Sequence, residues 1–257
     1  MTAQENPRKV SEKINDFVTT IEDSEHLTIV IEGVDDKDVY KEFEDIYPLN
    51  DPMVSVLEVG GRNTVLGIFK KLKDTEHINK VIFIVDKDQW VIKGIDAEYI
   101  HERVICTHGY SFENDIFIDG ALENDMQAKN ADVFNTELPT VLKWYALEMD
   151  RILNNRPTLN LAVYIDNLFN CPENFIHPQD GDTFPQEVFN KLLTEYPRLL
   201  RGKTLLNFYT RVMNNRSDKR YKGKYSDIQT IENVCKNKGS CLNRIFAEVD
   251  KLVTQQG

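Results

Sequence analysis

The stretch KVIFIVDKD at residues 80–88 decides the fold. Its five central residues are apolar and mostly β-branched, and charged residues close it on both sides, which is typical of a strand buried in a parallel sheet. Two further runs of this kind precede it, LTIVIEG at 27–33 and SVLEVGG at 55–61, and RVICTHGYS at 103–111 predicts a fourth strand.

Amphipathic segments alternate with these strands. Apolar residues recur at helical spacing in 8–24, 36–47 and 62–74, and ENDIFIDGAL at 113–122 opens another helix. Strands that alternate with helices form parallel sheets with right-handed crossovers. The predicted fold class is therefore α/β, a parallel sheet flanked by helices, with a mainly helical C-terminal part.

The pattern becomes helical after residue 120, most clearly at 204–213 and 240–253. This helical part either packs onto the sheet or forms a domain of its own. The predicted organisation has three parts: an N-terminal helix at 1–24, an α/β domain at 25–120 and a helical C-terminal region at 121–257.

The composition describes an ordinary globular protein. The chain has 257 residues, of which 41% are hydrophobic and 28% charged, which excludes a disordered chain, a collagen and a coiled coil. No apolar run approaches the roughly 20 residues that cross a bilayer, and the N-terminus lacks the apolar region of a secretory signal, so no membrane contact is expected. The four cysteines form no CxxC pair, which favours free thiols and a cytoplasmic location.

The net charge of −11 is unevenly distributed. Residues 201–224, called the basic segment below, hold eight lysines and arginines against one acid, a net charge of +7, so the remainder carries −18. A basic stretch on an acidic body suits phosphate contact in one place and cation binding in another. A solvated loop that happens to be basic explains the same charge pattern without a partner.

Carboxylates follow three of the predicted strands. Glu32 ends the first strand, with Asp36 shortly after it; Asp86 and Asp88 end the third strand, and the fourth runs into Glu113. Because active sites in parallel sheets gather beyond the carboxyl ends of the strands, we expect these acids at one edge. Clustered carboxylates repel one another, and a hard divalent cation such as Mg²⁺ relieves that repulsion. Two such ions can promote phosphodiester cleavage by water.

These acids also have structural alternatives. An aspartate after a strand is often only the N-cap of the next helix, and Asp35 or Asp36 can cap the helix predicted at 36–47 in this way. Glu32 is harder to explain as a cap, because it ends the strand itself. The DxD pair alone is a weak signal, and its combination with the earlier Glu32–Gly33 and a later acid is more specific.

Four short motifs occur in an order that resembles a known family. They are I-E-G-x-x-D at 31–36, V-G-G-R at 59–62, F-I-V-D-K-D at 83–88 and Y-S-F-E-N at 110–114. Together they resemble the Toprim-like DUF4435 family, which is similar to the Toprim domains of the OLD nucleases. That family includes the nuclease component of the PARIS anti-phage system, a Toprim protein paired with an ATPase. The resemblance covers residues 27–118, and R-G-K-x-L-L at 201–206 is similar to a further segment of the family.

The resemblance implies a role for each acid. Glu32 would be a metal ligand or general acid/base, Asp86 and Asp88 would be metal ligands, Glu113 would complete the metal shell, and Asp36 is a further candidate ligand. The implied cofactor is Mg²⁺ or Mn²⁺. Many Toprim enzymes continue DxDxxG, whereas this chain reads DKDQWV, and the missing glycine argues against a topoisomerase or primase.

The resemblance therefore implies a Toprim-like fold and a metal-dependent nuclease that cleaves DNA or RNA, including tRNA. It would be a toxic effector of anti-phage defence, controlled by an ATPase partner and acting as a homodimer once released. The alternative is a non-catalytic Toprim-fold module that binds or senses within a defence complex, against which the intact acids argue. Phosphoryl transfer on nucleotides rather than polymers is a third interpretation, and the basic segment favours the polymer.

Basic residues provide candidate phosphate contacts. Arg62 follows a glycine pair at a helix start, a place that suits phosphate as well as a tight turn. Lys203 is a candidate catalytic residue that would touch a scissile phosphate as a point charge, although a lysine also suits a helix start. Gly202, Lys203 and Thr204 look like the end of a P-loop, but Pro197 replaces the first glycine of that motif, so we expect no ATP site.

The end of the basic segment is interleaved with tyrosines, which suits single-stranded or looped nucleic acid through phosphate contact and base stacking. No zinc finger or other recognition motif is present, so no sequence preference follows. The candidate contacts there are Arg216, Lys219, Arg220, Lys222 and Lys224, beside Tyr221 and Tyr225.

Overall fold

The chain forms two compact units. The first consists of Met1–Lys87, Ile95–Thr107 and Asn243–Gly257, and the second of Asp88–Gly94 and His108–Leu242. Residues 243–257, which the sequence analysis grouped with the helical region, thus belong to the first unit. The computed structural model describes residues 7–48, 53–159, 161–179, 183–214 and 223–255.

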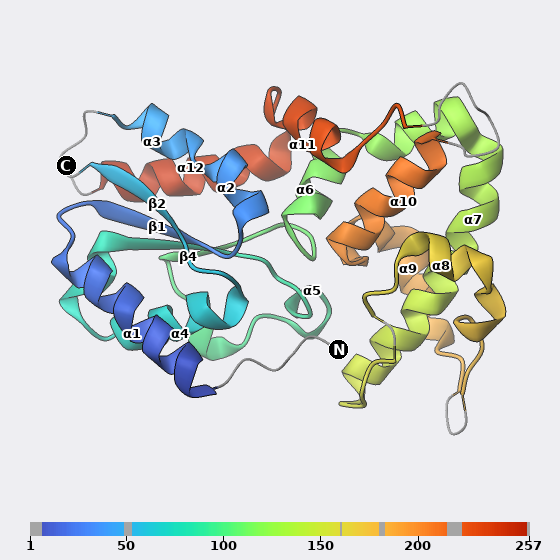
Figure 1. Cartoon of the computed structure of the whole chain (residues 1–257), viewed down its shortest axis with the longest axis horizontal. Helices are drawn as coiled ribbons and strands as arrows, with labels where there is room; N and C mark the ends of the chain where they lie inside the picture. The colour runs from blue at the N-terminus through green and yellow to red at the C-terminus, as the bar shows by residue number, and fades with distance from the viewer. Residues whose placement is uncertain (1–6, 49–52, 160, 180–182, 215–222, 256–257) are drawn as a thin grey trace. The chain divides into compact units, whose positions relative to one another are not determined.

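A four-stranded parallel sheet forms the first unit's framework (Figure 1). Its strand order is β2-β1-β3-β4 and every neighbouring pair is parallel, which confirms the predicted α/β class. Every residue of β1 and β3 is buried, as expected for strands covered on both faces. The strands are β1 (Leu27–Ile31), β2 (Val54–Glu58), β3 (Val81–Val85) and β4 (Val104–Cys106).

The segments predicted as amphipathic helices around this sheet are helical. The helix predicted at 36–47 is divided at Lys41 into two short helices, although Lys41 keeps helical dihedral angles of φ −59° and ψ −22°. A Cβ at Gly67 of α4 would overlap the Ile14 side chain, so a glycine here allows α1 and α4 to pack closely. The helices are α1 (Pro7–Asp23), α2 (Val34–Tyr40), α3 (Glu42–Ile46) and α4 (Arg62–Leu72), with 3-10 turns at Glu76–Lys80 and Ala97–Tyr99.

The last helix, α12 (Ser240–Thr254), returns the chain to the first unit. Phe246 stacks on Phe43 of α3, with ring centroids 4.4 Å apart. Arg244 donates a 2.5 Å hydrogen bond to the carbonyl of Cys106, the last residue of β4. These contacts are long-range in sequence, so a local pattern shows the helix but not the unit that it joins.

The second unit is helical, which confirms the predicted helical C-terminal part. Its longest helix, α7, carries fully buried Trp144 and Tyr145 and is interrupted at Asn130, where φ is −148° and ψ is 46°. Phe134 and Phe208 extend this aromatic core, with ring centroids 6.1 Å apart. The helices are α5 (Trp90–Lys93), α6 (Phe112–Asp119), α7 (Leu122–Leu153), α8 (Ile165–Asn170), α9 (Gln186–Leu199), α10 (Gly202–Asn214) and α11 (Asp227–Cys235), with a 3-10 turn at Pro172–Asn174.

Among the described residues, no helix combines the length and the apolar character that crossing a membrane requires.

Asp119, the last residue of α6, caps the N-terminal turn of α12. One carboxylate oxygen accepts the backbone N–H of Cys241 at 2.8 Å, and the other accepts that of Leu242 at 2.9 Å. The first N–H groups of a helix have no partner within the helix, and a carboxylate also interacts favourably with the helix dipole there. Asp119 therefore fixes where α12 begins.

Replacing Asp119 by asparagine should destabilise the protein. Asparagine has one acceptor oxygen where aspartate has two, so one N–H of α12 loses its partner, at a cost of about 1–2 kcal/mol in the free energy of unfolding. Urea unfolding followed by circular dichroism measures this. Asp132→Asn, at an exposed position of α7, is the matched control and should cost less than about 0.5 kcal/mol. Equal stabilities of the two variants would contradict the capping role.

Candidate functional site

Glu32 and Asp86 meet at the carboxyl edge of the sheet in the first unit. Glu32 follows β1 and Asp86 follows β3, and these two strands are paired in parallel. The backbone N–H of Asp86 donates a 3.0 Å hydrogen bond to Oε1 of Glu32, whose side chain is only 14% exposed. The expected neighbourhood of these two acids is therefore present, and the Glu32 carboxylate is held in one orientation.

Arg62 joins this acid pair from the start of α4. Its guanidinium lies 3.9 Å from Oε1 of Glu32 and also donates to the backbone carbonyl of Asp86. The preceding Gly60 and Gly61 have backbone φ angles of 77° and 120°, which residues other than glycine rarely adopt. The N–H of Gly61 donates a 2.7 Å bond to the carbonyl of Glu32, so the glycine turn sets where Arg62 begins its helix.

Asp36 makes a capping contact at the start of α2, which is the structural alternative to metal binding. Its Oδ2 accepts the backbone N–H of Gly33 at 3.0 Å, in the first turn of α2. This bond satisfies a donor at the entry of a short helix, as an N-terminal carboxylate commonly does. The geometry thus explains Asp36 without a metal ion.

Asp88 and Glu113 belong to the second unit. The N–H of Asp88 donates a 2.6 Å bond to the carbonyl of Tyr110, and Asp88 has a φ of 47°, in the left-handed region that aspartate tolerates better than most residues. Glu113 is 93% buried in the first turn of α6 and accepts a hydrogen bond from the hydroxyl of Ser111. Each of the two acids is therefore fixed by the turn that precedes α6.

Asn114 connects that turn to the chain between α9 and α10. Its side-chain amide donates 2.8 Å bonds to the carbonyls of Pro197 and Leu200, and its Oδ1 accepts the N–H of Ser111. Asn114 is completely buried, so all of these groups depend on it for their hydrogen bonds. The Y-S-F-E-N and R-G-K motifs, far apart in sequence, therefore lie side by side.

Gly202 begins α10 against the start of α6. A Cβ at this position would overlap the hydroxyl of Ser111 and lie 2.7 Å from Oε2 of Glu113, so only glycine fits. The glycine of the R-G-K motif is thus explained by close packing rather than by a phosphate loop. The next residue, Lys203, has an exposed side chain in the first turn of α10.

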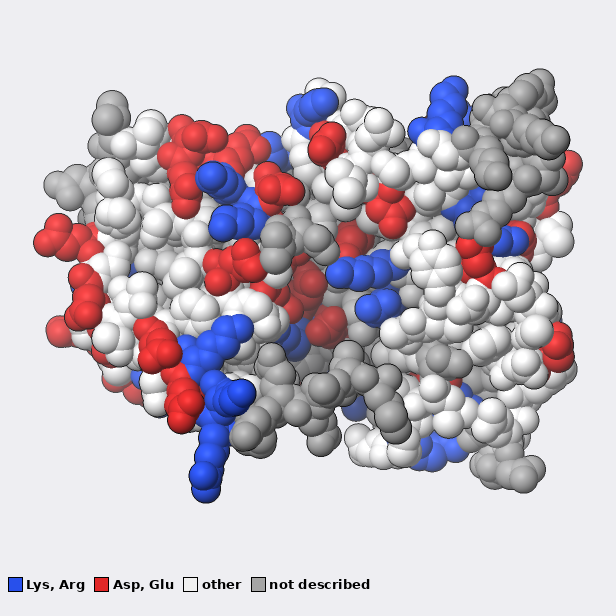
Figure 2. Space-filling model, viewed as in Figure 1, with Lys and Arg blue, Asp and Glu red and all other residues white. Residues whose placement is uncertain are grey.

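The remaining predicted phosphate contacts are only partly described. Lys224 is exposed in the second unit, whereas Arg216, Lys219, Arg220 and Lys222 lie outside the described residues. On the first unit, Figure 2 shows acidic side chains gathered in the region of α3, which contains Glu42, Glu44 and Asp45. That region does not suit a polyanion, whereas Arg62 places a guanidinium at the acidic strand ends.

Cys106, at the end of β4, is not suited to be a nucleophile. Burial raises the pKa of its thiol, and nearby Lys87, Arg62 and Arg244 lower it only in part. The reactive form of cysteine is the thiolate, which burial disfavours. The chemistry of this edge therefore depends on its carboxylates and on Arg62.

In the described parts of the chain, no group of three or more histidine, cysteine, aspartate or glutamate side chains is arranged to hold a metal ion. The structure brings Glu32, Arg62 and Asp86 together in the first unit, and Glu113 lies close to the start of α10 in the second. The expectation that all predicted acids share one metal shell stays a prediction.

No protein-family model and no curated protein matches the chain. The Toprim-like resemblance of the four motifs therefore stays a prediction.

Asn114→Ala tests the connection between α6 and the α9–α10 turn. The substitution leaves two carbonyls and one N–H without partners in a buried place, so the free energy of unfolding should fall by about 3 kcal/mol or more. Urea unfolding of the full chain measures this. Asn124→Ala, at an exposed position of α7, should change the free energy by less than about 0.5 kcal/mol. A similarly small effect at both positions would show that the buried amide is not needed.

Proposed function

We propose that the protein is a metal-dependent nuclease whose reaction centre is built on Glu32 and Asp86. The observation that carries the proposal is the hydrogen bond from the backbone N–H of Asp86 to the Glu32 carboxylate, which brings these two residues together at the carboxyl edge of β1 and β3, with Arg62 beside them. Ligand sites of open parallel sheets lie at this edge. Two acids and a guanidinium are also the groups that phosphodiester hydrolysis uses, for holding a cation and a phosphate.

The donor chemistry of this edge fits a magnesium or manganese ion. Both metals prefer oxygen ligands and are usually bound through one or two carboxylates together with water and phosphate. Glu32 and Asp86 would hold such an ion, which when bound supplies positive charge at the phosphate and lowers the pKa of a bound water. The Glu32 carboxylate is already oriented by the N–H of Asp86, which supports its role as a ligand held in place.

Arg62 would orient the substrate. A guanidinium is planar, always charged and matched to two phosphate oxygens, so it can turn from the acid pair to a phosphate. Its 3.9 Å separation from Glu32 is at the long end for an ion pair, and its main-chain bond to Asp86 keeps it at this edge. Arg62 thus holds the phosphate while Glu32 accepts a proton or binds the cation.

The wider proposal follows the family resemblance. Asp88 and Glu113 would complete the metal shell, and Lys203 would contact the scissile phosphate. The substrate would be DNA or RNA, including tRNA, and the protein would act in anti-phage defence as a homodimer released by an ATPase partner. Each of these further roles depends on hydrolysis of a phosphodiester at Glu32 and Asp86.

Glu32→Gln and Asp86→Asn should each abolish cleavage without unfolding the protein. Both variants keep the shape of the side chain, and glutamine keeps the acceptor oxygen for the N–H of Asp86, but each removes a negative charge. Cleavage of duplex DNA, single-stranded DNA and total RNA in Mg²⁺ or Mn²⁺ should fall at least about a hundredfold. Circular dichroism checks the fold.

Asp74→Asn, at an exposed position after α4, is the matched control and should cleave like the wild type. If the wild type cleaves nothing even with the protein encoded next to it and a phage trigger, or if all three variants cleave equally, Glu32 and Asp86 are not a nuclease centre. The non-catalytic binding module would then be the better interpretation.

Replacing Lys219, Arg220 and Lys222 by alanine should weaken polymer binding in a salt-dependent way. Each lost phosphate contact reduces the slope of log affinity against log salt concentration by about 0.9, so three contacts reduce it by about 2 to 3. Filter binding in EDTA between low and moderate salt measures the slope. A triple alanine variant at exposed Lys9, Lys41 and Lys71 is the control. An unchanged slope would exclude the basic segment as the binding surface.

A further inference from the structure

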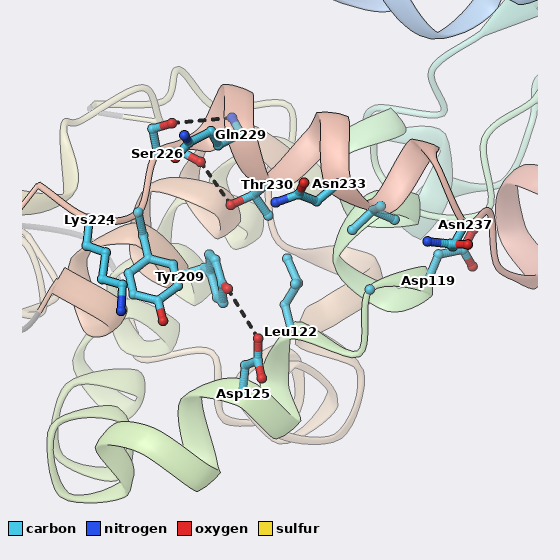
Figure 3. A pocket seen from close by; sticks show the side chains of 13 residues that line it. Asp119, Leu122, Asp125, Tyr209, Lys224, Ser226, Gln229, Thr230, Asn233 and Asn237 are labelled. Atoms are coloured by element: carbon cyan, nitrogen blue, oxygen red, sulfur yellow. Dashed lines mark hydrogen bonds between the residues drawn. The ribbon is translucent and has the colours of Figure 1, made fainter. Parts of the chain in front are cut away.

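A cavity of about 430 Å³ opens in the second unit beside α11 (Figure 3). The end of α6, the start of α7, Tyr209 of α10 and the chain from Lys224 to Asn237 line it. Its volume lies within the range of sites that bind small molecules, which is about 300–1,000 Å³. Nothing in the proposed reaction uses this cavity, so its lining requires a separate explanation.

Side-chain amides dominate one wall of the cavity. Gln229 and Asn233 are four residues apart on α11 and therefore project from the same face, and Asn237 follows beyond the end of the helix. Within the described part of the chain, none of these three amides makes a hydrogen bond to another residue. Figure 3 shows Thr230 and Asn233 on the side of α11 that faces the cavity. This wall offers paired donors and acceptors to a ligand.

Two tyrosines also line the cavity, Tyr209 on α10 and Tyr225 directly before the N-cap of α11. Their rings, at Tyr209 and Tyr225, stand at 85° with centroids 6.4 Å apart. Asn214 fixes the backbone of Tyr225 from both sides, through a 3.0 Å bond from its N–H and a 2.9 Å bond to its carbonyl. The Tyr209 hydroxyl donates to Asp125 at 3.5 Å, as Figure 3 shows, and burial raises the pKa of this phenol, so it stays protonated.

The charges around the cavity narrow the class of ligand. Asp119 uses both carboxylate oxygens to cap α12, and Asp125 is paired with Lys129 at 3.2 Å and accepts the Tyr209 hydroxyl, so both acids of the lining already have partners. One carboxylate next to two tyrosines does not suit a divalent cation, which prefers several oxygen ligands. The exposed Lys224 adds a cation at the rim, where it can meet an anionic group. Buried Leu122 and Val234 supply an apolar surface within the cavity.

We propose that this cavity binds a single nucleotide. Amides of asparagine and glutamine pair with the donor and acceptor edges of bases, and a tyrosine ring provides a surface on which a base can stack. The base would lie between Asn233 on α11 and Tyr225, and its phosphate would lie at Lys224. The nucleotide can be free or part of a single strand, because both present the same base and phosphate.

Isothermal titration calorimetry in EDTA tests the proposal on the full-length protein. Titration with AMP, GMP, CMP and UMP should show saturable binding of at least one of them. Asn233→Ala and Tyr225→Ala should each weaken it at least about tenfold, since each removes a hydrogen bond or a stacking surface. Asn124→Ala removes an exposed amide that does not line the cavity and should leave the affinity unchanged.

The role of Lys224 is measured with the matching nucleoside. The wild type should bind the nucleotide more tightly than the nucleoside, and Lys224→Ala should remove that preference. Lys236→Ala, an exposed lysine outside the cavity lining, should keep it. Circular dichroism and thermal unfolding of every variant separate a binding loss from a folding defect, and Tyr225→Phe, which keeps the ring, should retain binding.

A single-stranded oligonucleotide of the preferred base distinguishes the two sources of the nucleotide. Competition between oligonucleotide and mononucleotide assigns the cavity to a polymer, and binding of the mononucleotide alone assigns it to a free nucleotide. Absence of saturable binding for all four mononucleotides and their oligonucleotides, or equal binding by wild type and Asn233→Ala, would overturn the proposal. Glu32→Gln should bind the nucleotide like the wild type. The binding result can therefore be interpreted even if the nuclease proposal fails.

Discussion

The parallel pairing of β1 with β3 is the constraint on which the candidate reaction centre depends. The register places Val30 opposite Phe83, so the two strands end beside each other and their next residues deliver Glu32 and Asp86 to one edge. A slip of one residue would turn every side chain of a strand to the opposite face of the sheet. All residues of both strands are buried, so the packing of two faces, rather than any bond of the acids themselves, holds this register.

Charge balance at this edge depends on main-chain groups. The Glu32 carboxylate is partly buried, and taking its charge out of water has a free-energy cost. The structure offsets it with a backbone N–H on Glu32 and with the guanidinium of Arg62, which the Gly60–Gly61 turn delivers to the same place.

Local sequence patterns were sufficient for the fold and for this edge. Apolar runs predicted all four strands, helical spacing predicted the helices around them, and the class that follows from their alternation is confirmed. The neighbourhood of Glu32 and Asp86 followed from the rule that parallel strands end at a common edge, which needs strand ends and no knowledge of packing. The helix break at Lys41 was missed, because its dihedral angles remain helical and no proline or glycine marks it.

Long-range packing decided what sequence patterns left open. In the sequence, Gly202 resembles part of a phosphate loop. The structure shows that a glycine is needed there because α10 begins directly against Ser111 and Glu113. The amide of Asn114 finds its acceptors more than 80 residues away, a distance at which no spacing rule operates. Asn233 is a further example: its sequence context is that of an ordinary exposed helical residue, and only the fold brings it into one cavity with Tyr209 and Tyr225. A residue's chemistry is readable from the sequence, whereas the group that it faces is a property of the fold.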